Sequence, residues 1–317
     1  MSSARSVRLP KNRFDLGLNN WDCFPFEKPI RSIFVEKQPR GMMPSMSLPY
    51  DQDIPSDTLL SVATDAARQA GAVLTECIRT GFRIAHKQII NLVTDADCQA
   101  EQRIIDVIHE AFPTHRILAE EGGLTEQSSS RYKWVVDPLD GTTNFAHGFP
   151  AYCVSIGVEC DGRGIIGVVY DPNRDELFTA KIGQGAYLNG IPISVSTTDH
   201  LDRALLVTGF AYDIRETPNN NLNHFARFAL KVQGLRRTGT AALDLCYVAA
   251  GRFDGFWEVT LNPWDVAAGV IILREAGGTV TDFKGAPHSI YGRELVASNG
   301  PIQQAMLDLL QEDTIAS

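Results

Sequence analysis

The chain has 317 residues, which exceeds the length at which one hydrophobic core usually stops growing, so two lobes are expected. A hydrophobic content of 44% and a charged content of 21% are typical of a globular protein, and no apolar run is long enough to span a membrane. The net charge of −9 disfavours nucleic acid as the main partner, because binding to phosphates requires a basic face.

The first 55 residues carry prolines, scattered basic residues and no sustained hydrophobic period. We expect a poorly ordered tail here, with a transit peptide over residues 1–45 or a start at Met46 as alternatives. Four acidic residues before position 40 argue against a transit peptide. A cytoplasmic location is therefore favoured, and the plastid stroma is the alternative.

The cysteines and histidines indicate a reduced compartment and no zinc site. None of the six cysteines forms a C-x-x-C pair, and several lie inside apolar patterns. The seven histidines form neither a cluster nor an H-E-x-x-H motif.

Two amphipathic helices open the folded part of the chain. The first is predicted from the helical apolar spacing over 56–78, with Ser56 or Asp57 as its N-cap. The second follows Thr94 and has one apolar face.

Two short strands follow, and each leads into a carboxylate. The first is predicted over 117–119 and precedes Glu120. The second, KWVVD, runs into Asp137, with Asp140 in the turn after it.

The segment 153–193 predicts antiparallel hairpins. Turn residues stand at 161–162, 171–173 and 189–190. Three glycines here, Gly162, Gly164 and Gly167, match the dinucleotide motif G-x-G-x-x-G. That site requires a helix directly after the glycines, and a strand is predicted instead, so we reject a dinucleotide site.

The second half alternates strands and helices. Strands are predicted at 204–210, 253–259, 279–283 and 295–299, and helices around 222–232, at 240–251, within 263–278 and from Pro301. The helix after Pro263 is expected to have Asp265 at its N-cap and Gly277 just beyond its end. These blocks predict stacked α and β layers, with lobes at 56–197 and 198–317.

Four acidic residues lie where regular elements end or begin, which is where folds carry their sites: Glu120, Asp137, Asp140 and Asp265. Hard oxygen donors without histidine or cysteine select Mg²⁺, Mn²⁺ or Ca²⁺. An EF-hand counted from Asp137 would require ligands where Leu139 and Gly148 stand, so that interpretation fails.

The residues after Asp140 predict an anion site. Gly141 has no Cβ, so backbone N–H groups can approach a ligand closely. A helix that begins at Gly141 or Thr142 would direct its first N–H groups at an anion. Carboxylates before this point and N–H groups after it would hold a metal and a phosphate together. A plain turn at DPLDGT is the alternative.

Three segments resemble, in order, the signature segments of the inositol monophosphatase family: LAEEGG, WVVDPLDGTTNF and PWDVAAG. The resemblance covers about residues 56–312 and is nearest to the plant and cyanobacterial branch. It implies an α+β fold, the layered α/β/α/β/α sandwich of the inositol monophosphatase and fructose-1,6-bisphosphatase type, with largely antiparallel sheets. It also implies a lithium-sensitive phosphomonoesterase that uses two or more Mg²⁺ ions and forms a homodimer.

The resemblance implies two metal positions. Glu120 and Asp137 would bind the metal that activates water, with the Leu139 carbonyl as a further ligand. Asp137, Asp140 and Asp265 would hold a second metal on the side of the leaving group.

It also implies how water and substrate are held. The Thr142 hydroxyl, oriented by Asp97, would position the attacking water, and the N–H groups of Gly141 and Thr142 would bind phosphate. The substrate hydroxyls would face Asp140, Asp265, Glu258, Gly239, Thr240 and Ala241.

Some of these residues have other interpretations. Asp97 fits a capping box with Thr94 equally well. Asp265 could be only a helix cap, and Glu258 a surface strand residue. Asn91 stands where many relatives have an acidic residue, which leaves a further weak metal site in doubt.

We therefore predict an enzyme that hydrolyses a small phosphate monoester, with myo-inositol 1-phosphate favoured and no nucleic acid or membrane as partner. A sugar phosphate or histidinol phosphate is the first alternative. Thr143 argues against histidinol phosphate, because such relatives tend to carry lysine there. The second alternative is a catalytically silent family member that acts as a binding protein.

Overall fold

The computed structural model describes residues 53–86, 92–124 and 129–312. Residues Ser47–Ser317 form one compact unit. Of the predicted tail over residues 1–55, residues 1–52 lie outside the described residues, and so does the family departure at Asn91. The division of the folded part into two lobes stays a prediction. Within the described ranges, no helix has both the length and the apolar character needed to cross a membrane.

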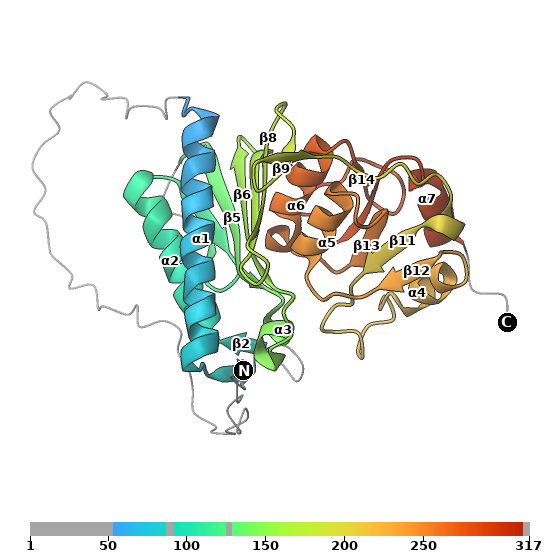
Figure 1. Cartoon of the computed structure of the whole chain (residues 1–317), viewed down its shortest axis with the longest axis horizontal. Helices are drawn as coiled ribbons and strands as arrows, with labels where there is room; N and C mark the ends of the chain where they lie inside the picture. The colour runs from blue at the N-terminus through green and yellow to red at the C-terminus, as the bar shows by residue number, and fades with distance from the viewer. Residues whose placement is uncertain (1–52, 87–91, 125–128, 313–317) are drawn as a thin grey trace, which may run out of the picture. The chain divides into compact units, whose positions relative to one another are not determined.

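Two large sheets carry the fold (Figure 1). The larger has the strand order β10-β9-β8-β7-β6-β5-β3-β4. Its strands are β3 (Arg116–Ala119), β4 (Gly123–Leu124), β5 (Tyr132–Asp140), β6 (Cys153–Cys160), β7 (Arg163–Asp171), β8 (Glu176–Lys181), β9 (Ala186–Leu188) and β10 (Ile191–Ile193). The described strands of this sheet pair antiparallel, apart from the parallel pair β3 and β5.

The smaller sheet has the order β12-β11-β13-β15-β14. Its strands are β11 (Leu205–Thr208), β12 (Gly234–Arg236), β13 (Gly255–Val259), β14 (Thr279–Thr281) and β15 (Glu294–Ser298). Strand β11 pairs in parallel with β12 and β13, whereas β15 pairs antiparallel with β13 and β14. A separate short ribbon joins β1 (Ile84–His86) to β2 (Leu92–Thr94).

Helices form three layers around these sheets (Figure 1). Helices α1 (Ser56–Thr80) and α2 (Asp95–Ala111) cover one face of the larger sheet. Helices α5 (Ala241–Ala249) and α6 (Pro263–Glu275) fill the space between the two sheets. Helices α4 (Leu222–Ala229) and α7 (Gln303–Gln311) pack on the outer face of the smaller sheet. This α/β/α/β/α arrangement confirms the predicted fold class.

Glycines let α6 approach the larger sheet closely. A Cβ on Gly157 of β6 would lie 2.8 Å from Ala267 Cβ, and one on Gly167 of β7 would lie 2.5 Å from the Ala268 carbonyl oxygen. The G-x-G-x-x-G glycines therefore belong to a hairpin that packs against a helix, and a strand follows them as predicted. This close packing sets where the first turn of α6 lies relative to the larger sheet.

Three local predictions were wrong in detail. Helix α1 begins at Ser56 with Pro55 as its N-cap, because the fixed φ of proline suits the residue before a helix. In α6 the N-cap is Asn262, and Asp265 is the third helical residue, whose side chain completes a capping box.

The third concerns Asp140, which ends β5 and does not lie in a turn after it. The pairing of β5 with β6 is irregular between Asp137 and Asp140. Pro138 stands within that irregular stretch and has no N–H to donate to the neighbouring strand. The strand therefore continues past a bulge, and Asp140 stays in the sheet.

Candidate active site

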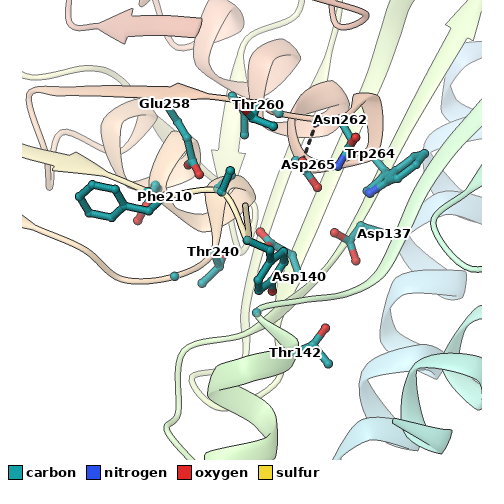
Figure 2. Close-up of a pocket in the computed structure, with 18 of the residues that line it drawn as sticks. Asp137, Asp140, Thr142, Phe210, Thr240, Glu258, Thr260, Asn262, Trp264 and Asp265 are labelled. Atoms are coloured by element: carbon teal, nitrogen blue, oxygen red, sulfur yellow. Dashed lines mark hydrogen bonds between the residues drawn. The ribbon is translucent and has the colours of Figure 1, made fainter. Parts of the chain in front are cut away.

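A pocket of about 340 Å³ opens where β5 ends and where helices α3 (Thr142–His147), α5 and α6 begin (Figure 2). Every site residue predicted above lines this pocket except Asp97. The residues come from segments up to 145 positions apart, between Glu120 and Asp265. The fold thus gathers the acidic residues that the sequence places at separate element ends.

Backbone N–H groups fix one oxygen of three of these carboxylates. Asp137 Oδ1 accepts a hydrogen bond of 2.9 Å from the Leu139 N–H. Asp140 Oδ2 accepts one of 2.8 Å from the Ala242 N–H at the start of α5. Asp265 Oδ2 accepts one of 2.7 Å from the Asn262 N–H, as part of the capping box. The side chains are therefore oriented before any ligand binds.

The carboxylates also raise one another's pKa. Burial raises the pKa of Asp137 well above its usual value, and the charges of Glu120, Asp140 and Asp265 raise it further. Burial likewise raises the pKa of Asp140 to about 6 and that of Asp265 to about 8. A cation in this pocket would relieve both the burial penalty and the repulsion.

The donor chemistry fits a hard divalent cation, since the candidate ligands are carboxylate and carbonyl oxygens. Over the described ranges, however, no three Asp, Glu, His or Cys side chains are grouped closely enough to hold a metal ion. A cation at this position would therefore need the carboxylates to lie closer together than they do in this structure.

The two carboxylate oxygens of Asp97 accept hydrogen bonds from two different residues, Thr94 and Thr142. The side chain is 1% exposed at the start of α2. Its Oδ2 accepts hydrogen bonds from the Thr94 N–H and hydroxyl, at 2.8 and 2.6 Å, which completes the capping box. Its Oδ1 accepts a hydrogen bond of 3.1 Å from the Thr142 hydroxyl. The capping and orienting interpretations of Asp97 are thus compatible.

The start of α3 has the form expected of an anion site. Gly141 is its N-cap, with a φ of +99° that favours glycine, and the helix begins at Thr142. A Cβ at Gly141 would also lie 3.0 Å from the Ala151 carbonyl oxygen. The chain can therefore turn sharply here and direct its first N–H groups into the pocket.

Glu258 lies on β13 and faces the pocket (Figure 2). Its carboxylate packs over Gly209, where a Cβ would lie 2.2 Å from Oε2. Burial raises its pKa well above the usual range, and the neighbouring acids Asp265 and Asp244 add to this effect. Thr260, with a φ of +64°, then turns the chain from β13 toward α6. That left-handed conformation is unusual for a β-branched residue and brings Glu258 and Asp265 to the same pocket.

Sequence reasoning missed several residues that line the pocket, among them Phe210, Tyr212, Arg237, Trp264 and Arg293. Trp264 stands next to Asp265, and Arg237 stands two residues before Gly239, so proximity in the sequence was a usable signal. The other three belong to segments that carry no motif, and only the folded chain brings them to the pocket.

An α+β layered fold whose acidic pocket adjoins a helix N-terminus has the parts that a metal-assisted phosphate-ester hydrolase needs. Residues 56–314 match the model of the inositol monophosphatase family. The chain belongs to that family.

Relatives support this assignment. An inositol-1-monophosphatase from Synechocystis is 48% identical, over 81% of this chain and 90% of that protein. The Nus factor SuhB of Escherichia coli is 43% identical, over 80% of this chain and 96% of that protein. A structure of inositol monophosphatase from Anabaena matches with a TM-score of 0.75 and 46% identity, over 82% of this chain and 98% of that one.

These matches confirm the predicted family and the resemblance to its cyanobacterial members. They also confirm that the chain is a phosphatase, an enzyme that cleaves phosphate monoesters, from a family that generally depends on metal ions.

Proposed function

We propose that this protein hydrolyses a small polyol phosphate, with myo-inositol 1-phosphate preferred, in the presence of Mg²⁺. The observation that carries the proposal is the position of Thr142, whose hydroxyl is hydrogen-bonded to Asp97. Thr142 lines the same pocket as the four acidic residues Glu120, Asp137, Asp140 and Asp265. Gly141, at the start of α3, and Glu258, on β13, line this pocket too.

The residues that would hold Mg²⁺ are Glu120, Asp137, Asp140, Asp265 and the carbonyl of Leu139. Two such ions, when bound, supply Lewis-acid stabilisation of the attacking and leaving oxygens of an in-line displacement. We propose two or more Mg²⁺ ions and lithium sensitivity on the strength of the family resemblance.

The protein side chains would orient the reactants. The Thr142 hydroxyl lies 3.1 Å from both Asp97 Oδ1 and the Leu139 carbonyl oxygen, and its single proton can go to one of them. With a metal on the Leu139 carbonyl, the proton would go to Asp97, and the Thr142 oxygen could accept a hydrogen bond from the attacking water. The N–H groups of Gly141 and Thr142 would bind the phosphate oxygens. Glu258, with the turn at Gly239, would accept hydrogen bonds from the polyol hydroxyls.

Cys153, which lies close to Asp140, is poorly suited to act as a covalent nucleophile. Its Sγ lies 3.9 Å from Asp140 Oδ2 and 3.7 Å from Thr240 Oγ1. Burial raises the pKa of the thiol well above its usual value, and the charge of Asp140 raises it further. A thiol that keeps its proton is a weak nucleophile, which favours direct attack by water.

Two alternatives remain. A sugar or histidinol phosphate would use the same chemistry. A binding role is the second candidate, because a relative that matches most of the chain is known as a Nus factor.

Phosphate release from a panel of these compounds, with and without Mg²⁺, tests the proposal. We expect the highest kcat/KM for myo-inositol 1-phosphate and no release without Mg²⁺. A higher value for another compound would reassign the substrate. A protein that is inactive on the whole panel would favour the binding role.

We also propose a homodimer in the cytoplasm. The homodimer rests on the family resemblance, and the location rests on the composition of the chain. Light scattering of the purified protein tests the oligomeric state.

A further inference from the structure

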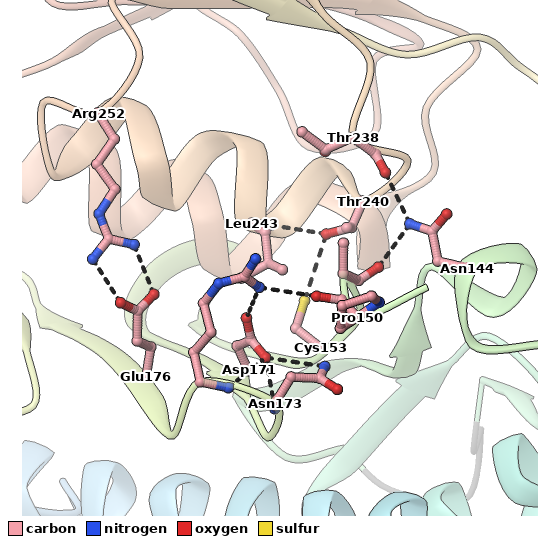
Figure 3. Close-up of polar contacts among 12 residues, drawn as sticks. Asn144, Pro150, Cys153, Asp171, Asn173, Glu176, Thr238, Thr240, Leu243 and Arg252 are labelled. Atoms are coloured by element: carbon pink, nitrogen blue, oxygen red, sulfur yellow. Dashed lines mark hydrogen bonds and ion pairs between the residues drawn. The ribbon is translucent and has the colours of Figure 1, made fainter. Parts of the chain in front are cut away.

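The side-chain amide of Asn144 is hydrogen-bonded to two segments of the chain, one at Ala151 and one at Thr238. Asn144 lies in the first turn of α3, two residues after Thr142, the second of the proposed phosphate-binding residues. Its Nδ2 donates hydrogen bonds to the Ala151 carbonyl, at 2.7 Å, and to the Thr238 carbonyl, at 2.8 Å (Figure 3). Both amide protons are therefore committed to carbonyls from different parts of the chain.

The hydrogen bond to the Ala151 carbonyl concerns the proposed phosphate-binding end of α3. The Ala151 carbonyl oxygen is also the atom that a Cβ on Gly141 would approach to 3.0 Å. Asn144 thus holds the carbonyl against which the N-cap of α3 packs.

The hydrogen bond to the Thr238 carbonyl concerns the turn proposed to bind the polyol. Thr238 directly precedes Gly239, Thr240 and Ala241, the turn assigned to the polyol hydroxyls. A Cβ at Gly239 would lie 3.0 Å from Asn144 Nδ2, so the amide also packs against this turn. Thr238 is also held through its side chain, because its hydroxyl donates a hydrogen bond to the buried carboxylate of Asp244.

We propose that Asn144 is a positioning residue that sets the spacing between the phosphate-binding amides of α3 and the polyol-binding turn at 239–241, and that it thereby determines substrate specificity. This inference rests on the proposed function. A polyol phosphate must engage both segments at once, and its reacting phosphorus is placed correctly only if their spacing is correct. An aryl phosphate engages the phosphate side alone.

The test compares two substrates in Asn144→Asp. This change keeps the size of the side chain and replaces the donor of both hydrogen bonds with an acceptor. We expect kcat/KM for myo-inositol 1-phosphate to fall about tenfold more than that for an aryl phosphate, the fold-change equivalent of one strong hydrogen bond. Any weakening of competitive inhibition by inorganic phosphate should match the fall for the aryl phosphate, because both engage only the α3 side.

Asn189→Asp is the matched control. Asn189 lies in the turn between β9 and β10 and does not line the pocket. Its Nδ2 donates to the Asp175 carbonyl, and its Oδ1 accepts from the Leu177 N–H. This variant should lower the melting temperature without changing the ratio of the two kcat/KM values. A ratio that is unchanged in Asn144→Asp, or that changes equally in Asn189→Asp, overturns the inference.

If Asn144→Asp does not fold, Asn144→Ala gives the same test without a new charge. It removes both hydrogen bonds from Asn144 and leaves the Ala151 and Thr238 carbonyls in place. We expect the ratio to fall in the same direction by about tenfold. An unchanged ratio again overturns the inference. A wild-type protein that releases no phosphate from any compound overturns the proposed function instead.

Discussion

Glu258→Gln should weaken binding of the polyol and leave the chemistry of the phosphate intact. The substitution keeps the shape of the side chain that packs over Gly209 and, at a pH above the raised pKa of Glu258, removes its negative charge. A hydrogen bond to a charged acceptor contributes about 1.5–3 kcal/mol, against about 0.5–1.5 kcal/mol for a neutral one. The difference for one hydroxyl is about 1.4 kcal/mol, which corresponds to a roughly tenfold higher KM for myo-inositol 1-phosphate.

The assay measures KM and kcat for myo-inositol 1-phosphate and for an aryl phosphate, which has no polyol ring. The KM for the aryl phosphate should change by less than about twofold. Because burial raises the pKa of Glu258 well above its usual value, wild type and variant should converge as the pH is lowered and Glu258 becomes neutral.

Two further variants sharpen this test. Gly209→Ala would place a Cβ 2.2 Å from Glu258 Oε2, so the carboxylate must shift and KM should rise in the same selective way. Glu110→Gln, an exposed glutamate near the end of α2, should have no effect. Equal changes for both substrates, or no change for either, would refute the assignment of Glu258 to the polyol.

Three other predictions concern the metal site and the tail. Asp137→Asn should lower kcat by a factor that corresponds to at least ~3 kcal/mol and leave the fold intact; a near-normal kcat at ordinary Mg²⁺ would remove Asp137 from the mechanism. Because burial raises the pKa of Asp140 to about 6 and that of Asp265 to about 8, chelator-treated protein should lose stability as the pH rises from 5 to 8.5. We expect its melting temperature to fall by at least about 5 °C and Mg²⁺ to restore it, and a flat profile would contradict the repulsion. A chain that starts at Met46 should keep its activity and melting temperature, and a drop of many degrees would contradict a dispensable tail.

Local patterns were enough to predict most elements of the fold. The helical spacing in α1 and α2 and the turn residues of the β6–β9 hairpins depend on neighbours in the sequence, and the structure contains these elements. The errors are also local in origin. Whether Asn262 or Asp265 caps α6 depends on one turn of backbone, since both residue types are good N-caps.

The connections across the site could not be predicted in this way. Asp140 accepts a hydrogen bond from the Ala242 N–H 102 residues later, and Asn144 donates to a carbonyl 94 residues later. Such pairs depend on how two sheets pack around α5 and α6, and no spacing in the sequence encodes that packing. The motif segments located the ligand candidates, whereas the residues that hold those segments together required the fold.

Three helix N-termini meet at the pocket, and they explain why its carboxylates differ in pKa. Residues at the starts of α3, α5 and α6 all line it, and helix N-termini carry partial positive charge. Asp140 accepts hydrogen bonds from the Ala241 and Ala242 N–H groups of α5, which oppose the effect of burial and leave its pKa at about 6. Asp137 accepts a hydrogen bond from the Leu139 N–H, which opposes the effect of burial, but burial and three neighbouring acids raise its pKa well above its usual value. A cation bound beside Asp137 would therefore stabilise the ionised form, which burial and the neighbouring acids disfavour.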